Sequence, residues 1–462
     1  MNETRSENVT RVATDGIVRR TLRHLYELSR LAGPIVVSRS GFLLLVMMDT
    51  IMTGRYATQE LAFLAISLSI FMPMMIVTLG MVMGTLVLTA NKHGAGLLAE
   101  CGPIWRRSVQ FALLLGAVSF VIGLFGEKLL LWSGQTHAIA VGGGEVVFAL
   151  GLGLCGHLVF LSSAFFLEGL GRPRPAMFVM IGANALNFGL NWVLIYGALG
   201  NEPMGAAGAA YATTLTRWTM AIALGLIVWN LRDQEALRIR EPLEGGFSSW
   251  RALRRIGYAI GLSVGVESIA FAALNAFAGW LGAVPLAAYG MTFNLMAFIF
   301  MLAIGVGAAT AVRVGNAYGR GDMPDAALAG WVGVAATLLI MFVAGLSFST
   351  WPEPLAGIYT DDPILLAQAI IAIAFIKWTS MPDGGQATMA NALRGRGDVW
   401  IPCLIQTICF FFVMVPIAYV CAFTWGYGIS GLFYGIIAGC VASLVALSVR
   451  FQLLIYSDMK KV

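Results

Sequence analysis

The chain has 462 residues, of which 58% are hydrophobic and 11% are charged. A soluble globular domain carries about 25% charged residues, so the composition excludes a soluble enzyme and indicates an integral membrane protein. The net charge of +5 does not imply nucleic-acid binding, because the basic residues follow the membrane topology described below.

Twelve apolar stretches follow one another along the chain. A bilayer core about 30 Å thick is crossed by about 20 apolar residues in helical conformation, and each stretch reaches about this length. They cover residues 31–53, 61–90, 108–126, 142–167, 176–199, 207–231, 257–281, 286–312, 327–351, 363–393, 400–424 and 428–449. We therefore predict an all-α integral membrane protein with twelve transmembrane helices.

The distribution of Lys and Arg predicts the orientation. If the N-terminus is cytoplasmic, the cytoplasmic segments hold 24 of the 29 basic residues, and the opposite side holds two, Arg55 and Lys128. This asymmetry is the positive-inside pattern, so both termini are expected in the cytoplasm. Residues 1–27 are polar and basic, without the apolar core and cleavage site of a signal peptide.

The two halves of the chain resemble each other. When the chain is aligned with itself, the segment from Leu61 falls on the segment from Leu286, and a marginally longer offset places LEGLG (167–171) on LRGRG (393–397). Because each half holds six spans, both halves enter the membrane from the same side, related by a pseudo-two-fold axis along the membrane normal. The predicted parts are an N-terminal tail (1–27), a first lobe (28–231), a cytoplasmic linker (232–256), a second lobe (257–451) and a C-terminal tail (452–462).

Six charged side chains within the predicted spans are candidate functional residues. They are the carboxylates Asp49, Glu267 and Asp383 and the cations Arg39, Arg217 and Lys377. Ionised groups inside a membrane are costly, and they usually face the bundle interior or a water-filled cavity on an ion or substrate path. Structural ion pairs are the alternative explanation for all six, and the basic side chains can also snorkel to the interface.

Polar residues at helical spacing accompany Asp49. Asn187 and Asn191, in NALNFGLNW (184–192), are four residues apart and share one face of a helix. Their amide oxygens suit Na⁺, and their amide N–H groups suit a hydrogen bond to Asp49. Interhelical amide bonds alone are the alternative explanation.

His157 is either a proton relay or, more commonly for a lone histidine in a membrane, a hydrogen-bonded packing residue. Glu168, with Arg172, is expected at the membrane interface.

Glycines and prolines suggest how the helices pack and bend. Gly257, Gly261 and Gly265 form a ridge of small residues that allows close helix approach, which we expect to bring the helices of Glu267 and Asp383 together. Pro34 and Pro382 remove backbone hydrogen bonds, so both are expected bending points.

Motifs of soluble enzymes are missing from the sequence. GLGLCG (151–156) lies inside an apolar span without a preceding strand, and there is no G-x-x-x-x-G-K-[ST] loop for ATP. The six cysteines lack metal-ligand spacing and are expected to be small core residues. No cofactor is therefore expected, and an ion gradient is the expected energy source for any transport.

Four motifs resemble those of the multidrug and toxic compound extrusion (MATE) transporters, NorM branch. They are MMDTIMTG around Asp49, LNFGLNW in the fifth span, GVE at Glu267 and LRGRGD ten residues after Asp383, and the resemblance covers about residues 25–450. It implies two six-helix lobes forming a V around a central cleft, in a monomer of the bacterial inner membrane. The implied function is antibiotic resistance by export of cationic or amphipathic drugs in exchange for Na⁺ or H⁺.

The resemblance also assigns site residues by position. Asp49, Asn187 and Asn191 match the polar site of the first lobe, and Glu267 and Asp383 match the cation site of the second lobe, where Na⁺ is a candidate ligand. The amide-rich first lobe favours Na⁺ slightly, but two carboxylates exchange protons equally well.

The cations Arg39, Arg217 and Lys377 stand where neutral residues are expected in this branch, and we assign them, with His157, to the substrate cleft. They favour an alternative, a lipid or lipid-linked oligosaccharide flippase of the same wider superfamily with a cationic cleft. A membrane-embedded enzyme or a structural membrane protein is disfavoured, because the chain is duplicated and lacks a catalytic constellation.

The topology yields the first testable prediction. Single cysteines replacing Gln135 and Ser248 in a cysteine-free background should react with an impermeant maleimide from opposite sides of the membrane, Gln135→Cys from the outside, because the basic residues divide 24 to two. Labelling of both positions from one side would contradict the twelve-helix topology.

Overall fold

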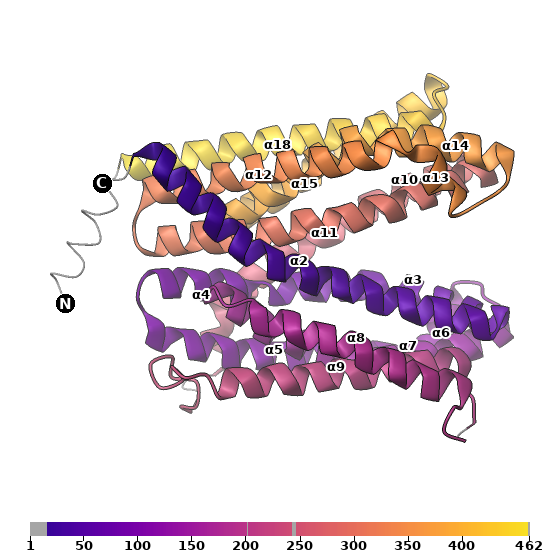
Figure 1. Cartoon of the computed structure of the whole chain (residues 1–462), viewed down its shortest axis with the longest axis horizontal. Helices are drawn as coiled ribbons and strands as arrows, with labels where there is room; N and C mark the ends of the chain where they lie inside the picture. The colour runs from indigo at the N-terminus through magenta and orange to yellow at the C-terminus, as the bar shows by residue number, and fades with distance from the viewer. Residues whose placement is uncertain (1–15, 201, 243–245, 461–462) are drawn as a thin grey trace.

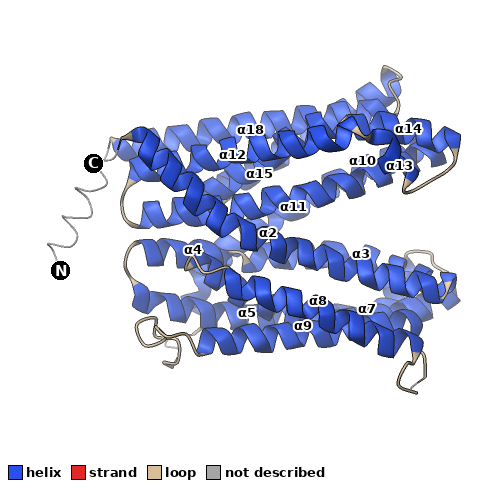
Figure 2. Cartoon of the chain, in the orientation of Figure 1, coloured by secondary structure: helices blue, strands red, loops and turns tan. Residues whose placement is uncertain are grey.

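The computed structural model describes residues 16–200, 202–242 and 246–460, and within these ranges all regular structure is helical (Figures 1 and 2). The predicted N-terminal tail, linker and C-terminal tail fall partly outside the described residues. The first half comprises α2 (Ile17–Tyr56), α3 (Thr58–Val82), α4 (Gly84–Gly94), η1 (Leu98–Glu100), α5 (Cys101–Gly123), α6 (Gly126–Trp132), α7 (His137–Gly169), α8 (Arg174–Tyr196) and α9 (Gly205–Trp229).

The second half begins with a short 3₁₀ helix and contains the remaining spans. Its elements are η2 (Phe247–Trp250), α10 (Arg251–Leu281), α11 (Ala283–Gly319), α12 (Met323–Thr350), α13 (Pro352–Gly357), α14 (Pro363–Ala374), α15 (Ile376–Gly395), α16 (Trp400–Ile408), η3 (Cys409–Met414), α17 (Val415–Tyr419), η4 (Val420–Thr424) and α18 (Ile429–Met459). In the described residues, eleven helices are long and apolar enough to cross a membrane, and the bent pair α14–α15 makes twelve. The predicted fold class is confirmed.

Helix boundaries repeat between the halves. Helix α2 ends at Tyr56 and α10 at Leu281, and α4 ends at Gly94 and α11 at Gly319, so both pairs of ends share the offset that aligns Leu61 with Leu286. Helix α7 covers 137–169 and the pair α14–α15 covers 363–395, at the offset that aligns LEGLG with LRGRG. The internal repeat seen in the sequence is therefore a repeat of helices.

A reciprocal contact marks the pseudo-two-fold axis. The backbone of Asn316 leaves no room for a Cβ on Gly94, and the backbone of Asn91 leaves none on Gly319. Gly94 and Asn91 are the counterparts of Gly319 and Asn316 in the sequence repeat. The glycine of each half thus contacts the asparagine of the other half, as equivalent residues do across a two-fold axis.

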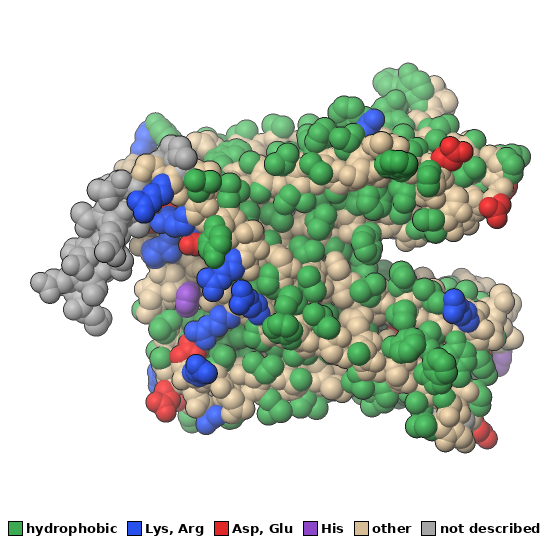
Figure 3. Space-filling view, viewed as in Figure 1, with side chains coloured by type: hydrophobic (Ala, Val, Ile, Leu, Met, Phe, Trp, Pro, Cys, Tyr) green, Lys and Arg blue, Asp and Glu red, His purple; other side chains and the backbone are tan. Residues whose placement is uncertain are grey.

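The halves form a V. They lie against each other at the end where α2 begins and α18 ends, which we call the termini end, and separate toward the other end, the open end (Figure 1). Helix α2 crosses between them, packing on α11 and α12 near its start and on α8 farther along. The space-filling view shows a hollow between the halves at the open end and a concentration of Lys and Arg at the termini end (Figure 3).

Two spans in the second half are irregular. The 44° bend of α14–α15 falls at Phe375, while Pro34 and Pro382 lie inside continuous helices. Just after the bend, the Thr379 hydroxyl donates to the carbonyls of Phe375 and Ile376. The span at 400–424 contains two π-helical segments, η3 and η4, on either side of Pro416.

The glycine ridge of α10 packs across the interface between the halves. The backbone around Met81 and Val77 of α3 closes on Gly257 and Gly261, and the Val77 side chain contacts Gly265. The prediction that this ridge brings α10 toward the helix of Asp383 was wrong. Close approach of two backbones is its role, but the partner is α3 of the other half.

A buried carboxylate joins the halves at the termini end. Asp325, in the first turn of α12, is 1% exposed and accepts hydrogen bonds from Arg23 (2.7 Å) and Arg320 (2.9 Å), and its Oδ1 lies 3.0 Å from His24 Nε2. Arg313 of α11 lies 2.9 Å from the other ring nitrogen of His24. Arg23 and His24 belong to α2, so this Asp325 cluster ties the first helix to the second half.

Removing the charge of Asp325 should open the termini end. Asp325→Asn leaves the surrounding cations uncompensated, and breaking a buried ion pair in this way costs roughly 3–5 kcal/mol. Spin labels at exposed Leu98 and Trp400, one in each half, should show a new population at longer distance in pulsed electron resonance. Asp458→Asn, which breaks the Arg396–Asp458 pair inside the second half, should not. An unchanged distance in Asp325→Asn would show that other contacts hold this end closed.

Candidate functional site

Three helices of the first half bring Asp49, Asn187 and Asn191 together. Asp49 of α2 is 7% exposed, and the two asparagines of α8 are fully buried. Asn191 Nδ2 donates to Asp49 Oδ1 at 2.8 Å and to Asn187 Oδ1 at 3.2 Å. The Thr213 hydroxyl, from α9, donates to Asp49 Oδ2 and accepts from Asn187 Nδ2. The predicted residues therefore form one hydrogen-bonded group, and the sequence missed only Thr213.

One oxygen of this group has no hydrogen-bond partner. Asn191 Oδ1 is buried and, among the described residues, accepts no hydrogen bond. A free amide oxygen on the residue that holds Asp49 adds a neutral ligand to a carboxylate, a combination that hard cations prefer. The group therefore combines a carboxylate with a neutral amide oxygen that has no hydrogen-bond partner in the described chain.

In the second half, one amide links Glu267 and Asp383. Gln386 of α15 donates through Nε2 to Glu267 Oε1 of α10 at 3.1 Å and to Asp383 Oδ1 at 3.4 Å. Its carbonyl accepts from Gln406 Nε2 of α16 at 2.8 Å. Cys440 Sγ of α18 lies 3.7 Å from Asp383 Oδ1. Four helices thus meet at the two carboxylates, and the glutamines were not predicted.

The network continues toward the termini end. Gln406 Oε1 accepts from the Ser263 hydroxyl and from Arg394, whose Nη2 also donates to Ser263 Oγ at 2.9 Å. Arg394 is 6% exposed and interacts electrostatically with Glu267. Its position in LRGRG, aligned with LEGLG of the first half, was the available signal for a buried charge there.

Arg39 is paired inside the first half. Its guanidinium lies 3.1 Å from Glu168 Oε1 and stacks 4.9 Å from the Phe165 ring. Glu168 lies one residue before the end of α7 and is 1% exposed, so at this end of the span it is buried inside the protein. Arg172 does lie outside the spans, where its two 2.8 Å hydrogen bonds lower the pKa of Asp233.

Arg217 is buried without a salt-bridging carboxylate in the described chain. It is 3% exposed, stacks 5.1 Å from the Phe71 ring, and interacts electrostatically with Asp49. Its Nε and Nη1 have no hydrogen-bond partner among the described residues. A guanidinium in this state favours an approaching anion or the dipole of a polar ligand.

His157 and Lys377 lie apart from the carboxylates. His157 is 3% exposed and packs with its ring centroid 5.1 Å from that of Phe42, which supports the packing interpretation. Lys377, at the start of α15, places Nζ over the Trp378 ring at 5.7 Å, and no described carboxylate lies within 4.0 Å. Taken with Arg39 and Arg217 above, the first half thus contains two buried acids, Asp49 and Glu168, and these two cations.

This arrangement defines a class of protein. Two repeated sets of six spans, with ionisable groups buried in each set and a hollow between them, are the architecture of secondary transporters.

Comparison with known proteins identifies the family. The MatE family model matches residues 34–193 and again 259–420, so the two matches begin at equivalent positions of the internal repeat. A probable multidrug resistance protein NorM of Caulobacter vibrioides is 35% identical over 437 residues, covering 94% of this chain and 93% of the relative. Multidrug resistance protein PmpM of Pseudomonas aeruginosa is 29% identical, covering 92% and 91%. The chain belongs to the MatE family, the MATE transporters.

Solved structures share the fold. A multidrug resistance MATE family transporter of the MOP superfamily in an outward-facing conformation superposes with a TM-score of 0.86 at 21% identity, covering 94% of this chain and 96% of that one. A MATE structure in the bent conformation gives a TM-score of 0.87 at 20% identity, covering 95% and 97%. The predicted V of two six-helix lobes is confirmed.

The Arg39–Glu168 pair should stabilise the first half. Glu168→Gln leaves Arg39 with an uncompensated charge, and Arg39→Met leaves a buried carboxylate; either change should destabilise the fold by roughly 3–5 kcal/mol. The double variant Arg39→Met/Glu168→Gln should recover most of the loss, as measured by thermal unfolding in detergent. Additive losses in the double variant would show that the two side chains do not stabilise each other.

Proposed function

We propose that this protein is a secondary active multidrug efflux transporter of the bacterial inner membrane. It exports organic cations or amphipathic drugs by alternating access, in exchange for Na⁺ or H⁺. The observation that carries the proposal is that each half buries carboxylates held mainly by neutral donors: Asp49 by Asn191 and Thr213, and Glu267 with Asp383 by Gln386. The names of the relatives, which describe multidrug resistance proteins, agree with it.

Coupling follows from the chemistry of these carboxylates. A carboxylate fixed by neutral hydrogen bonds keeps its negative charge available, so a proton or Na⁺ that binds there removes a charge from the apolar interior. Binding shifts the balance between two orientations of the halves by the difference in ion affinity between them. If the ion binds more tightly in the orientation from which the drug leaves, export is driven by ion entry.

The two sites suit the candidate ions differently. In the first half, Asn191 Oδ1 offers a neutral oxygen beside Asp49, which supports Na⁺. In the second half, the Gln386 amide presents N–H groups to both carboxylates, and its oxygen is engaged by Gln406. Two carboxylates that share one donor exchange a proton readily, while rotation of that amide would present an oxygen to Na⁺.

The conformation corresponds to one of the two states that alternating access needs. The hollow opens away from the termini end, which the Asp325 cluster closes. With both termini cytoplasmic, as the basic residues predict, this is the outward-open state. Opening of the Asp325 cluster and closure of the hollow would then produce the inward-open state.

A flippase for an anionic lipid or lipid-linked oligosaccharide is the second candidate function. The unpartnered nitrogens of Arg217 favour it, since they suit an anionic group. Neutralisation of Arg39 by Glu168 and of part of the Arg217 charge by Asp49 counts against a strongly cationic cleft. Transport of a fluorescent organic cation separates the two candidates, because a flippase of this kind would not move it.

The carboxylates should be required for coupled efflux. In proteoliposomes with imposed Na⁺ or pH gradients, Asp49→Asn should reduce efflux of a fluorescent organic cation at least tenfold, and Asn187→Ala should do so more mildly. Glu267→Gln and Asp383→Asn should each abolish the dependence on the gradient. Because both belong to one hydrogen-bonded unit, the double variant should be little worse than either single variant.

A matched control is Asp361→Asn, which removes an exposed carboxylate from the loop before α14 and should leave efflux unchanged. Normal gradient dependence in both Glu267→Gln and Asp383→Asn would refute the second-half site. A wild type that moves no organic cation under either gradient would refute the proposed function itself.

A further inference from the structure

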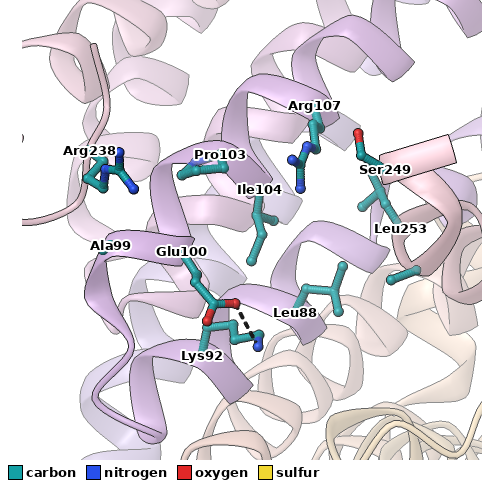
Figure 4. A pocket seen from close by; sticks show the side chains of 11 residues that line it. Leu88, Lys92, Ala99, Glu100, Pro103, Ile104, Arg107, Arg238, Ser249 and Leu253 are labelled. Atoms are coloured by element: carbon teal, nitrogen blue, oxygen red, sulfur yellow. Dashed lines mark ion pairs between the residues drawn. The ribbon is translucent and has the colours of Figure 1, made fainter. Parts of the chain in front are cut away.

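A basic pocket lies at the termini end, between the first half and the start of α10 (Figure 4). We call it the linker pocket. Its volume is about 320 Å³, within the range of small-molecule sites, roughly 300–1,000 Å³. It is built from segments far apart in the sequence: α4, η1 and α5 of the first half, the loop after α9, and η2 with α10 of the second half.

The pocket combines an apolar floor with a cationic rim. Leu88, Ile104 and Leu253 form part of the floor, and Arg107 and Arg238 extend into the pocket from two sides (Figure 4). Lys92 adds a third cation, and Glu100, paired with it at 2.7 Å, is the single acid among the described residues of the lining. The lining therefore has two more cations than acids.

Two ion pairs at the pocket are weak competitors for an anion. Lys92 and Glu100 are 37% and 51% exposed, and Arg238, which pairs with Glu241, is 50% exposed with its partner at 46%. Exposed pairs of this kind contribute little. An anion with several oxygens, placed between the two guanidiniums, would form stronger charge-assisted hydrogen bonds.

The backbone holds Arg238 in an unusual conformation. Its φ of 54° is the one positive value at a non-glycine residue in the described chain. Leu237 and Ile239 on either side are fully buried, Gly102 N donates to the Leu237 carbonyl at 2.9 Å, and Arg106 donates to the Arg238 carbonyl at 3.3 Å. Strained residues that the surroundings fix in place occur preferentially at binding sites.

The position of the pocket identifies the ligand. Helices α4, α5 and α10 reach it at the ends of the membrane spans Thr58–Gly94, Leu98–Gly123 and Ser248–Leu281, the level of the lipid headgroups. Clustered basic residues at this level, between helices, recognise anionic headgroups. We infer that the linker pocket binds an anionic phospholipid, with its phosphate between Arg107 and Arg238 and its glycerol and upper acyl chain over the apolar floor.

Binding there would act on the conformation of the protein. The pocket takes side chains from α4 and α5 of one half and from α10 of the other, so its shape depends on how the halves meet at the termini end. A lipid that fits the pocket in this arrangement stabilises the closed termini end relative to the open one. Lipid binding at the linker pocket does not depend on which substrate the protein transports.

Native mass spectrometry of the purified full chain tests the binding. Phosphatidylglycerol should bind at one saturable site, and phosphatidylcholine should not. Arg107→Gln/Arg238→Gln should weaken phosphatidylglycerol binding about thirtyfold, because each cation near an anionic lipid contributes about 1 kcal/mol. Arg107→Lys/Arg238→Lys keeps both charges and should retain most of the binding. Retained binding in this variant would show that the pocket still folds when both arginines are replaced.

The matched control is Arg30→Gln/Arg251→Gln, which removes two exposed arginines from the same end outside the pocket. An equal loss of binding in this control would overturn the inference in favour of a non-specific basic surface. Equal binding of phosphatidylcholine would overturn it as well. Inorganic phosphate should not displace the lipid at comparable concentration; if it does, the pocket is a free-phosphate site and the lipid assignment is wrong.

Discussion

The cost of placing ionised groups in a membrane constrains the whole structure. An unpaired charge in the apolar interior is unfavourable, so each buried acid is found where at least one neighbouring helix brings a donor to it. Asp49 meets donors from α8 and α9, Glu267 and Asp383 share donors from α15, and Glu168 is covered by Arg39 of α2. The same requirement at Asp325 ties α2 to α12, and through this tie the two halves. Helix packing and ion chemistry are therefore set by the same side chains.

The repeat preserves helices but not charges. In the alignment of LEGLG with LRGRG, His157 corresponds to Asp383 and Glu168 to Arg394; in the alignment of Leu61 with Leu286, Phe42 corresponds to Glu267. The first half therefore has an aromatic contact between Phe42 and His157 where the second half has its two linked carboxylates. The Asp49 group of the first half and the Glu267–Asp383 pair of the second half lie at positions that the repeat does not relate. Two sites that differ in this way can respond differently to the same ion.

The sequence predicted the features that depend on composition and helical spacing. The twelve spans follow from the lengths of the apolar stretches. The hydrogen bond from Asn191 to Asp49 follows from a carboxylate within one span and two asparagines on one face of another. Contacts between distant helices were not predictable in the same way. Gln386, Gln406 and Arg394 join the second-half site because α15 and α16 meet α10 there. The glycine ridge shows the limit: small residues predict close approach but do not identify the partner, which proved to be α3.

The reciprocal contact of Gly94 with Asn316 and of Gly319 with Asn91 has an evolutionary consequence. Each half presents the same Asn-x-x-Gly step to the other, as identical subunits do across an isologous interface. A single six-helix chain carrying this step could pair with a second copy of itself without any new surface. Gene fusion would then have freed the two copies to diverge, which is how one copy can acquire a histidine where the other has an aspartate while both keep the glycine at their axis.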